Sequence, residues 1–263
     1  MSSNLFLSRE GVFPIVRGLD GAPLSTATGL NLSGTVQGEG KWCGTSALFV
    51  RLQGCNLKCR WQLSDGATVA CDTAHTWSSG GTACPVSDVA ELVRLNIGRM
   101  RHVVITGGEP CLQPEAVVQL IDMLHRLNLK VTVETNGSLF NAVAQMPDLL
   151  SLSPKLSSSG ISRQLRAQTV SAVRSNVLAA LDSGHDVQLK FVVSSQADED
   201  EILNDYAGSL SALVPDDVVV MPLGVSDAQL KLSTPLAVNM AIRNGWRFGP
   251  RLHISLFGNK EAT

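Results

Sequence analysis

The amino-acid sequence predicts an α/β fold, a partial, open α/β barrel of about six β/α units with a short N-terminal β extension. Apolar runs typical of buried strands alternate with segments of helical spacing along most of the chain. These helical segments are short enough to serve as crossovers, which implies parallel strands joined by right-handed connections. The chain of 263 residues shows only about six such units, so an open or partial barrel is favoured over a complete eightfold one, which typically needs about 250 residues without decoration.

The first part of the chain is expected to add β structure to the barrel. Residues 1–32 form the N-terminal extension, and two short apolar stretches around Leu19–Pro23 indicate a strand, a turn and a strand. Ala47–Leu52 is a short apolar run and is expected to be the first barrel strand, followed by a long loop rich in Cys and Gly. No repeat or linker divides the chain, so 1–263 is expected to be a single domain.

The later elements are assigned by apolar spacing and by helix-start signals. Ser87–Met100 has helical spacing with acidic residues near its start, and Pro114–Leu127 combines an initial Pro with apolar residues at helical intervals. Between them, His102–Thr106 is typical of a buried strand. The remaining expected elements are strands at Leu129–Glu134 and Leu149–Leu152, a helix at Thr169–Leu181, a strand at Val187–Val193, a helix at Asp198–Leu213, a strand at Val218–Met221, a helix at Leu236–Arg243 and a strand at Leu252–Leu256. The carboxyl ends of these strands should line the active site.

Composition and charge exclude several classes of partner. The chain is 44% apolar and 17% charged with a net charge of −2, which gives no electrostatic case for nucleic acid. No run of about 18 apolar residues is present, so no membrane span is expected. Residues 1–10 lack a basic start followed by an apolar run, so no signal peptide is expected and the protein is predicted to be cytoplasmic.

Three cysteines gather in the loop that follows the first barrel strand. In a reducing compartment the six cysteines are not expected to form structural disulfides. Cys55, Cys59 and Cys71 suit a 4Fe-4S cluster with three thiolate ligands and one open iron. A structural zinc with His75 or Cys84 as fourth ligand, or unrelated packed thiols, remain alternatives on spacing alone. The other cysteines, Cys43, Cys84 and Cys111, are expected to be packing residues.

The surroundings of these cysteines resemble the radical S-adenosylmethionine family, whose cysteine loop has the pattern CxxxCxxC after the first strand. Cys55, Cys59 and the aromatic Trp61 follow that pattern, but Gln62 stands where the third cysteine would be. Nine residues, 62–70, then precede Cys71, and 71–73 continue as the family loop does. We interpret 62–70 as an insertion in the cysteine loop.

Further segments are similar to the 7-carboxy-7-deazaguanine synthases of that family. The segments that carry the resemblance are 36–40 (VQGEG), 49–55 (FVRLQGC), 71–77 (CDTAHTW), 105–110 (ITGGEP), 134–137 (ETNG) and 153–155 (SPK). The resemblance implies ring contraction of 6-carboxy-5,6,7,8-tetrahydropterin to 7-carboxy-7-deazaguanine with loss of ammonia. It also implies the cofactors 4Fe-4S cluster, S-adenosylmethionine and Mg²⁺, an electron donor such as flavodoxin or ferredoxin, and a homodimer.

The resemblance also assigns roles to individual residues. It implies that Cys55, Cys59 and Cys71 hold the cluster and that the hydroxyl of Thr73, a hard oxygen ligand, binds Mg²⁺. The implied cofactor-binding residues are Asp72, Gly108, Glu109, Ser153, Pro154, Lys155, Met221, Pro222, Leu223 and Gly224. Among these, Glu109 is expected near the ammonium group of S-adenosylmethionine. The implied substrate-binding residues are Val36, Gln37, Gly38, Glu39, Arg51 and Thr106. The guanidinium of Arg51 can hold a carboxylate with two parallel hydrogen bonds, and a structural ion pair is its alternative role.

Two other functions compete with this interpretation. A radical activase that makes a glycyl radical on a partner protein would share the cluster and Gly-Gly-Glu-Pro, but it would not need Gln-Gly-Glu-Gly or Arg51. A zinc-stabilised binding module without catalysis would use the cysteines only to hold its fold.

Overall fold

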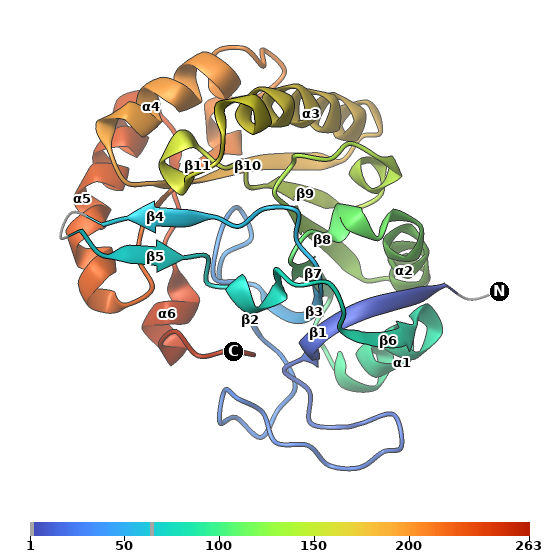
Figure 1. Ribbon diagram of the computed structural model, residues 1–263. Helices are drawn as coiled ribbons and strands as arrows, with labels where there is room; N and C mark the ends of the chain where they lie inside the picture. Colours follow the sequence, from blue (N-terminus) through green and yellow to red (C-terminus); the bar gives the residue numbers. More distant parts are fainter. Residues whose placement is uncertain (1–2, 64–65) are drawn as a thin grey trace.

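The computed structural model describes residues 3–63 and 66–263, and its centre is one mostly parallel sheet (Figure 1). Strands of the barrel lie side by side in the order in which they occur in the chain, and each pairs in parallel with the next. They are β3 (Ser46–Leu52), β7 (His102–Gly107), β8 (Lys130–Thr135), β9 (Leu149–Leu152), β10 (Asp186–Val193) and β11 (Val218–Pro222). The sheet does not close on itself, which confirms the predicted open barrel of about six units.

Additional strands complete both edges of the sheet. At one edge β12 (Arg247–Phe248) pairs in parallel with β11. At the other, β1 (Asn4–Phe13) runs antiparallel to β3, and β6 (Thr82–Pro85) runs antiparallel to β1. A further short strand, β2 (Thr35–Val36), also pairs with β3.

The N-terminal extension differs from the prediction in where its strand lies. The long strand is β1, which begins at Asn4, and the expected strand, turn and strand around Leu19–Pro23 reduces to one bridge between Arg17 and Pro23. The segment 14–34 projects from the body of the molecule (Figure 1). Few apolar partners are available there, so its leucines stay half-exposed and no sheet forms. Residues 1–2 of the extension lie outside the described residues.

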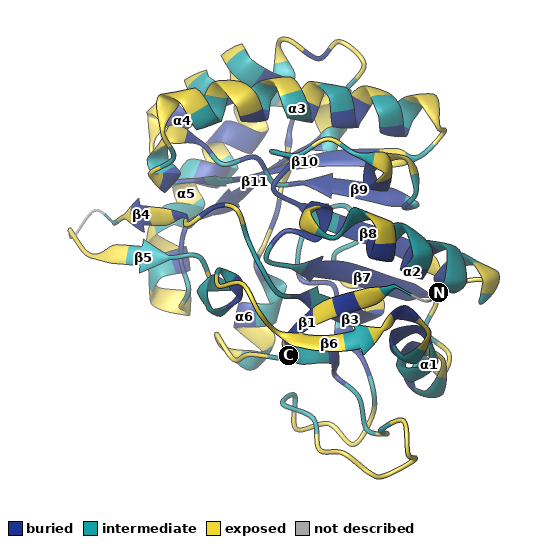
Figure 2. Cartoon of the chain, turned by 45° about the vertical axis from the view of Figure 1, so that its right-hand side comes forward, coloured by how far each residue is buried: buried dark blue, intermediate teal, exposed yellow. Residues whose placement is uncertain are grey.

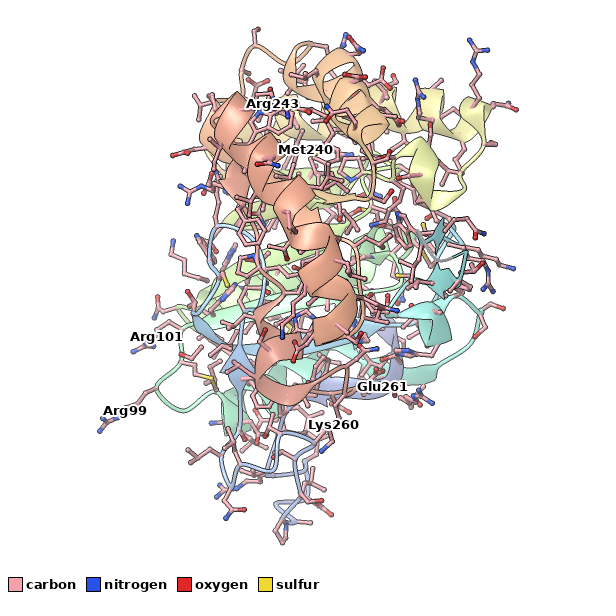
Figure 3. All side chains as sticks on the ribbon, turned by 90° about the vertical axis from the view of Figure 1, so that its left-hand side faces the viewer. Arg99, Arg101, Met240, Arg243, Lys260 and Glu261 are labelled. Carbon is pink, nitrogen blue, oxygen red and sulfur yellow. The ribbon has the colours of Figure 1, made fainter. Side chains whose placement is uncertain are left out.

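Helices cover the outer face of the sheet and leave the parallel strands buried (Figure 2). In chain order they are α1 (Val86–Asn96), α2 (Pro114–Arg126), α3 (Arg163–Asp182), α4 (Gln196–Ile202) and α5 (Asp227–Asn244). The apolar stripe predicted for α2 is fully buried at Val117, Leu120, Ile121 and Leu124. Helix α5 spans the end of the barrel beside β11 and β12 (Figure 3). No helix in the described part of the chain is long and apolar enough to cross a membrane.

Several helix ends differ from their predicted positions. Helix α1 ends four residues before Met100, and α3 and α5 begin several residues before Thr169 and Leu236. Helix α4 ends at Ile202 and is followed by a short π-helical turn, Leu203–Ala207, rather than by regular helix to Leu213.

The last predicted strand, Leu252–Leu256, is wrong because this segment forms helix α6 (Leu252–Phe257). Its residues alternate between apolar and polar, which is the pattern of a half-buried strand. The structure instead buries Arg251 and Ile254, three residues apart, and the Leu252 amide donates to the Gly38 carbonyl at 3.0 Å. A helical turn places two residues at this spacing on one face, so tertiary contacts decide the conformation.

The residues around the predicted insertion form a separate hairpin. Strands β4 (Arg60–Gln62) and β5 (Thr68–Ala70) pair only with each other. Below them, the Cys71 amide donates to the Cys59 carbonyl at 3.1 Å. Positions 64–65 of the predicted insertion lie outside the described residues. The hairpin therefore begins and ends at two of the predicted cluster ligands.

The loop between β2 and β3 fills the amino end of the barrel. The Lys41 ammonium lies 2.5 Å from Asp186 Oδ1 and 2.6 Å from Asp217 Oδ1, and the Lys41 amide donates to Gln188 Oε1 at 2.7 Å. The Trp42 ring packs edge-on against His102 with centroids 4.8 Å apart. These anchors place Gln37–Glu39, which precede them, inside the barrel.

Candidate active site

Two adjoining cavities lie where the parallel strands end, and most of the predicted site residues line them. The larger is lined by Val36, Gln37, Gly38, Glu39, Arg51, Cys55, Cys59, Asp72, Thr73, Thr106, Gly108, Ser153 and Lys155. The smaller is lined by Cys71, Met221, Leu223 and Gly224, and it shares Glu39, Asp72, Ser153 and Lys155 with the larger. Three predicted residues, Glu109, Pro154 and Pro222, are buried and line neither cavity.

The three loop cysteines come together at the junction of these cavities. Cys55, Cys59 and Cys71 pack in one apolar cluster with Leu57, Trp61 and Leu223. Burial raises the pKa of each of the three thiols, and the nearby Lys155 ammonium lowers it. A soft, anionic group with thiolate ligands fits a site that combines three sulfurs, apolar walls and one cation. The donor set therefore suits an iron–sulfur cluster.

The spacing of these sulfurs argues against a single zinc ion. Among the described residues, only Glu10, His75 and Glu261 form a group of three potential ligands whose atoms all lie within 4.8 Å of one another. Sulfurs on one tetrahedral zinc would lie about 3.8 Å apart. The three cysteine sulfurs are more widely spread, as a larger cluster requires.

Neither reserve ligand of the zinc alternative reaches the three sulfurs. Cys84 is in β6 opposite Leu5 and packs against the main core. His75 Nε2 lies 2.7 Å from Glu10 Oε1 instead. A closed four-ligand zinc site would need one of these side chains to move to the cysteine cluster.

Two glycines let the turn after β7 approach the cysteine loop. The Glu109 amide donates to the Gly54 carbonyl at 2.8 Å, and the Gly108 amide donates to the Leu52 carbonyl at 3.1 Å. A Cβ at Gly108 would lie 1.9 Å from Gly54 O, so no side chain fits there. The backbone at Gly108 consequently lines the cavity directly beside Cys55.

Glu109 is fully buried behind this turn. Its carboxylate accepts hydrogen bonds from the Thr135 hydroxyl at 2.6 Å, the Asn136 amide at 2.8 Å and the Cys111 amide at 2.9 Å. Burial raises the pKa of Glu109, and these hydrogen bonds lower it. A carboxylate has about four acceptor positions, and three of those of Glu109 are used within the protein. In this arrangement Glu109 joins the turns after β7 and β8.

Buried charges form the wall of the larger cavity on the predicted substrate side. The Lys190 ammonium donates to Glu134 Oε1 at 2.8 Å and to Glu39 Oε2 at 3.0 Å. Glu134 also accepts hydrogen bonds from the Thr106 hydroxyl at 3.0 Å and the Gln37 amide group at 3.3 Å. The network holds Gln37 and Glu39 from the amino-end loop against strands β7, β8 and β10.

Arg251 extends this network toward the smaller cavity. Its guanidinium donates to Glu39 Oε1 at 3.2 Å, to the Gly224 carbonyl at 3.0 Å and to Asp72 Oδ2. Burial would raise the pKa of Glu39, but the Lys190 and Arg251 cations lower it to about 2. Burial likewise opposes ionisation of Asp72, and Arg251 holds its pKa well below the usual range. Both carboxylates are therefore anions at neutral pH.

Arg51 lies in the larger cavity beside a carboxylate of its own chain. It pairs with Thr106 across β3 and β7, its Nε lies 3.6 Å from Glu10 Oε1, and its guanidinium carbon is 5.1 Å from the centroid of the Phe13 ring. The buried Nε has no hydrogen-bond partner. The structural ion pair considered for Arg51 thus exists with Glu10, but hydrogen-bond capacity remains for a ligand.

Thr73 lies in the larger cavity one residue beyond Asp72. Its hydroxyl is 3.3 Å from Cys71 Sγ. Since Asp72 is already paired with Arg251, Thr73 offers a single neutral oxygen. One oxygen suits Mg²⁺, which usually keeps several waters and ligand oxygens in its shell.

Sequence reasoning missed four charged or titratable residues of the site, Glu134, Lys190, Arg251 and His253. Lys190 carried a usable signal, because a lysine inside an otherwise apolar strand must find buried partners. Glu134 ends a predicted strand within a segment that carried the family resemblance. Arg251 and His253 lie in a C-terminal segment that resembles the end of the family's chains but lacks its final Pro, so the sequence assigned them no role.

Comparisons with known proteins show which family the sequence resembles. The model of the radical SAM superfamily matches residues 49–204. A protein of Halobacterium salinarum named 7-carboxy-7-deazaguanine synthase is 36% identical over 243 residues, which are 87% of this chain and 90% of that protein. A protein of Rhodopirellula baltica with the same name is 36% identical over 234 residues, 86% of this chain and 85% of that protein.

A solved structure shows the same fold. The crystal structure of QueE from Escherichia coli superposes with a TM-score of 0.56 at 24% identity, over 90% of this chain and 93% of that chain. The open, mostly parallel sheet is therefore shared with a known protein.

Proposed function

The chain belongs to the radical SAM superfamily and, within it, to the 7-carboxy-7-deazaguanine synthases. We propose that it catalyses the ring contraction of 6-carboxy-5,6,7,8-tetrahydropterin to 7-carboxy-7-deazaguanine, with loss of ammonia, in its two joined cavities. One observation carries the proposal. The three sulfurs of Cys55, Cys59 and Cys71 and the polar residues of 36–39 line the same pair of joined cavities. The two ligands of this reaction would therefore lie next to each other.

The smaller cavity and the junction suit the cofactors. Cys55, Cys59 and Cys71 would hold the 4Fe-4S cluster, and the backbone at Gly108 would lie against the methionine part of S-adenosylmethionine. When bound, the cluster and S-adenosylmethionine supply the one-electron chemistry of the reaction. Other residues proposed to bind the cofactor are Asp72, Ser153, Lys155, Met221, Leu223 and Gly224, which line the cavities, and Glu109, Pro154 and Pro222, which lie behind their walls.

The larger cavity suits a small, polar, anionic substrate. Arg51 would bind the substrate carboxylate, and Val36, Gln37, Gly38, Glu39 and Thr106 would contact the pterin ring. Glu39 is an anion held in place by Lys190 and Arg251, so it can accept hydrogen bonds from ring N–H groups without rearrangement. Glu134 fixes the hydroxyl of Thr106 and the amide of Gln37 in the same way.

The proposal includes partners that the cavity walls do not supply. The reaction needs an electron from outside, and a flavodoxin or ferredoxin would deliver it. The homodimer is carried over from the family resemblance alone, and the cytoplasmic location is carried over from the sequence-based prediction.

The test of function is an anaerobic assay of the reconstituted enzyme with the carboxytetrahydropterin, S-adenosylmethionine, Mg²⁺ and a reductant. The expected result is a product with the mass of 7-carboxy-7-deazaguanine and one released ammonia for each molecule formed. Cleavage of S-adenosylmethionine without any change of the pterin would contradict the proposal and favour the radical activase. Reconstitution with zinc in place of iron and sulfide would favour the binding module.

We predict that Thr73→Ala changes the Mg²⁺ dependence of turnover by weakening the binding of Mg²⁺. Loss of a direct ligand should raise the Mg²⁺ concentration needed by at least the roughly tenfold that outer-shell changes typically cause. The measurement is turnover against Mg²⁺ concentration in wild type and variant, with iron content as the control. An unchanged Mg²⁺ profile would assign Thr73 to the turn before the following 3₁₀ helix.

We predict that Arg51→Lys binds the carboxytetrahydropterin more weakly by about 1–3 kcal/mol, the scale of a hydrogen bond to a charged group. Lysine keeps the charge, but it cannot form two parallel hydrogen bonds to one carboxylate. Titration of substrate and S-adenosylmethionine separately against both proteins measures this, and S-adenosylmethionine affinity and iron content should stay nearly unchanged. Equal substrate affinity would leave Arg51 as the ion-pair partner of Glu10 only.

A further inference from the structure

One buried guanidinium connects the two cavities. Arg251 lies immediately before α6 and is 8% exposed. Its Nε contacts Glu39, its Nη1 contacts the Gly224 carbonyl, and its Nη2 contacts Asp72. The three acceptors come from three separate segments, the loop after β2, the turn after β11 and the cysteine loop.

On the substrate side, Arg251 is part of a rigid contact between α6 and the loop after β2. The Leu252 amide donates to the Gly38 carbonyl at 3.0 Å. A Cβ at Gly38 would lie 2.5 Å from His253 Nδ1 and 3.0 Å from the His253 amide nitrogen, so the two segments touch without space between them. A shift of Arg251 must therefore move Gly38 and Glu39 as well.

On the cofactor side, both acceptors border the cysteine cluster. Asp72 lies between Cys71 and Thr73 in the chain, and it lines both cavities. Gly224 follows β11 and lines the smaller cavity beside Leu223, which packs against the cysteines. A cofactor that orders these two segments also fixes two of the three acceptors of the guanidinium.

We propose that Arg251 is a positioning residue that couples the two ligands, so that S-adenosylmethionine in one half of the site strengthens binding of the substrate in the other half. This inference rests on the proposed function, because it concerns the two ligands of that reaction. Fixing Asp72 and Gly224 fixes the guanidinium, and the guanidinium in turn fixes Glu39 in the position that receives the substrate. Coupling between two binding sites is reciprocal, so the substrate must strengthen cofactor binding by the same factor.

The coupling factor itself is the quantity to measure. The reconstituted enzyme is titrated anaerobically, without reductant so that no turnover occurs, with the carboxytetrahydropterin in the presence and absence of saturating S-adenosylmethionine. The reverse titration provides the reciprocal factor. In the wild type we expect substrate affinity to rise about tenfold with the cofactor bound, within the range of typical coupling energies.

Arg251→Lys should reduce this factor to less than about twofold, because one ammonium cannot hold three acceptors that diverge around a planar guanidinium. Asp72→Asn keeps the shape of the side chain and removes its charge, so it provides a second variant if Arg251→Lys does not fold. Arg247→Lys is the matched control. Arg247 pairs on the surface with Asp216, and its replacement should leave the factor unchanged.

The outcomes separate this inference from the proposed function. A wild type that binds both ligands with no coupling overturns the inference and leaves the function intact. A wild type that binds neither ligand contradicts the function. Folded Arg251→Lys and Asp72→Asn proteins that both keep the wild-type factor also overturn the inference.

Discussion

Cys71→Ala should reconstitute without an iron–sulfur cluster, whereas Cys84→Ala should reconstitute like the wild type. Cys71 packs with Cys55 and Cys59 beside both cavities, while Cys84 lies in β6 and packs against the main core. In Cys71→Ala only two of the three thiolates that hold the cubane cluster remain. The visible absorption and the bound iron and sulfide should therefore be lost. Anaerobic reconstitution followed by absorption and metal analysis measures both.

The same experiment extends to the other two ligands. Cys55→Ala and Cys59→Ala should resemble Cys71→Ala, and no turnover should be detectable in any of the three. If Cys71→Ala keeps a full cluster while Cys84→Ala loses it, the third ligand has been assigned to the wrong cysteine. The interpretation of 62–70 as an insertion would then be wrong as well.

Gly108→Ala should both destabilise the protein and prevent cluster assembly. The added Cβ would meet Gly54 O at 1.9 Å and Gly54 C at 2.4 Å, and these are backbone atoms that cannot rotate away. Overpacking typically costs about 1–3 kcal/mol when side chains can adjust. The loss here should be at the upper end of that range or beyond, because the cysteine loop itself has to move.

Denaturant unfolding of the apoprotein gives the stability change, and bound iron after reconstitution gives the effect on the cluster. Gly184→Ala is the control. Gly184 has a φ of +76° and nothing within 4 Å of an added Cβ, so only the left-handed backbone costs energy, about 1–2 kcal/mol. A Gly108→Ala protein as stable as Gly184→Ala and with full iron content would show that the turn after β7 can separate from the cysteine loop.

The parallel strands were predictable because each is a short apolar run, which is typical of a strand that is buried on both faces of a sheet. Strand β9 has its predicted bounds, Leu149–Leu152, and β7 and β10 differ from theirs by one residue. The alternation of apolar and polar residues in 252–256 predicted a strand wrongly, because a pattern this short does not determine the secondary structure. An amphipathic pattern of five residues fits either period, and tertiary contacts select the helix, among them the hydrogen bond to Gly38, 214 residues away in the chain.

The candidate site was predictable where chemistry is carried by rare residues in a distinctive order. The cysteines, Arg51 and the glycine turn belong to this class, and the structure brings them to the same cavities. The ion pairs around Lys190 and Arg251 could not be derived from the sequence, because they join residues from five separate segments. The partners of Glu109 show a further limit, because its hydrogen bonds to Thr135 and Asn136 join turns that lie 26 and 27 residues apart in the chain.

Because of the hairpin β4–β5, Cys59 and Cys71 lie close together in space although they are separated in the sequence. Its two strands leave and return at Cys59 and Cys71, whose backbones are joined by one hydrogen bond. The length of what lies above that bond does not alter the geometry below it, and lengthening a closed loop costs little conformational entropy. A peptide inserted between the two strands should therefore be tolerated, whereas the strands themselves supply Trp61, Val69 and Ala70 to the wall of the smaller cavity. For the same reason, a search that requires three cysteines at fixed intervals would overlook enzymes built like this one.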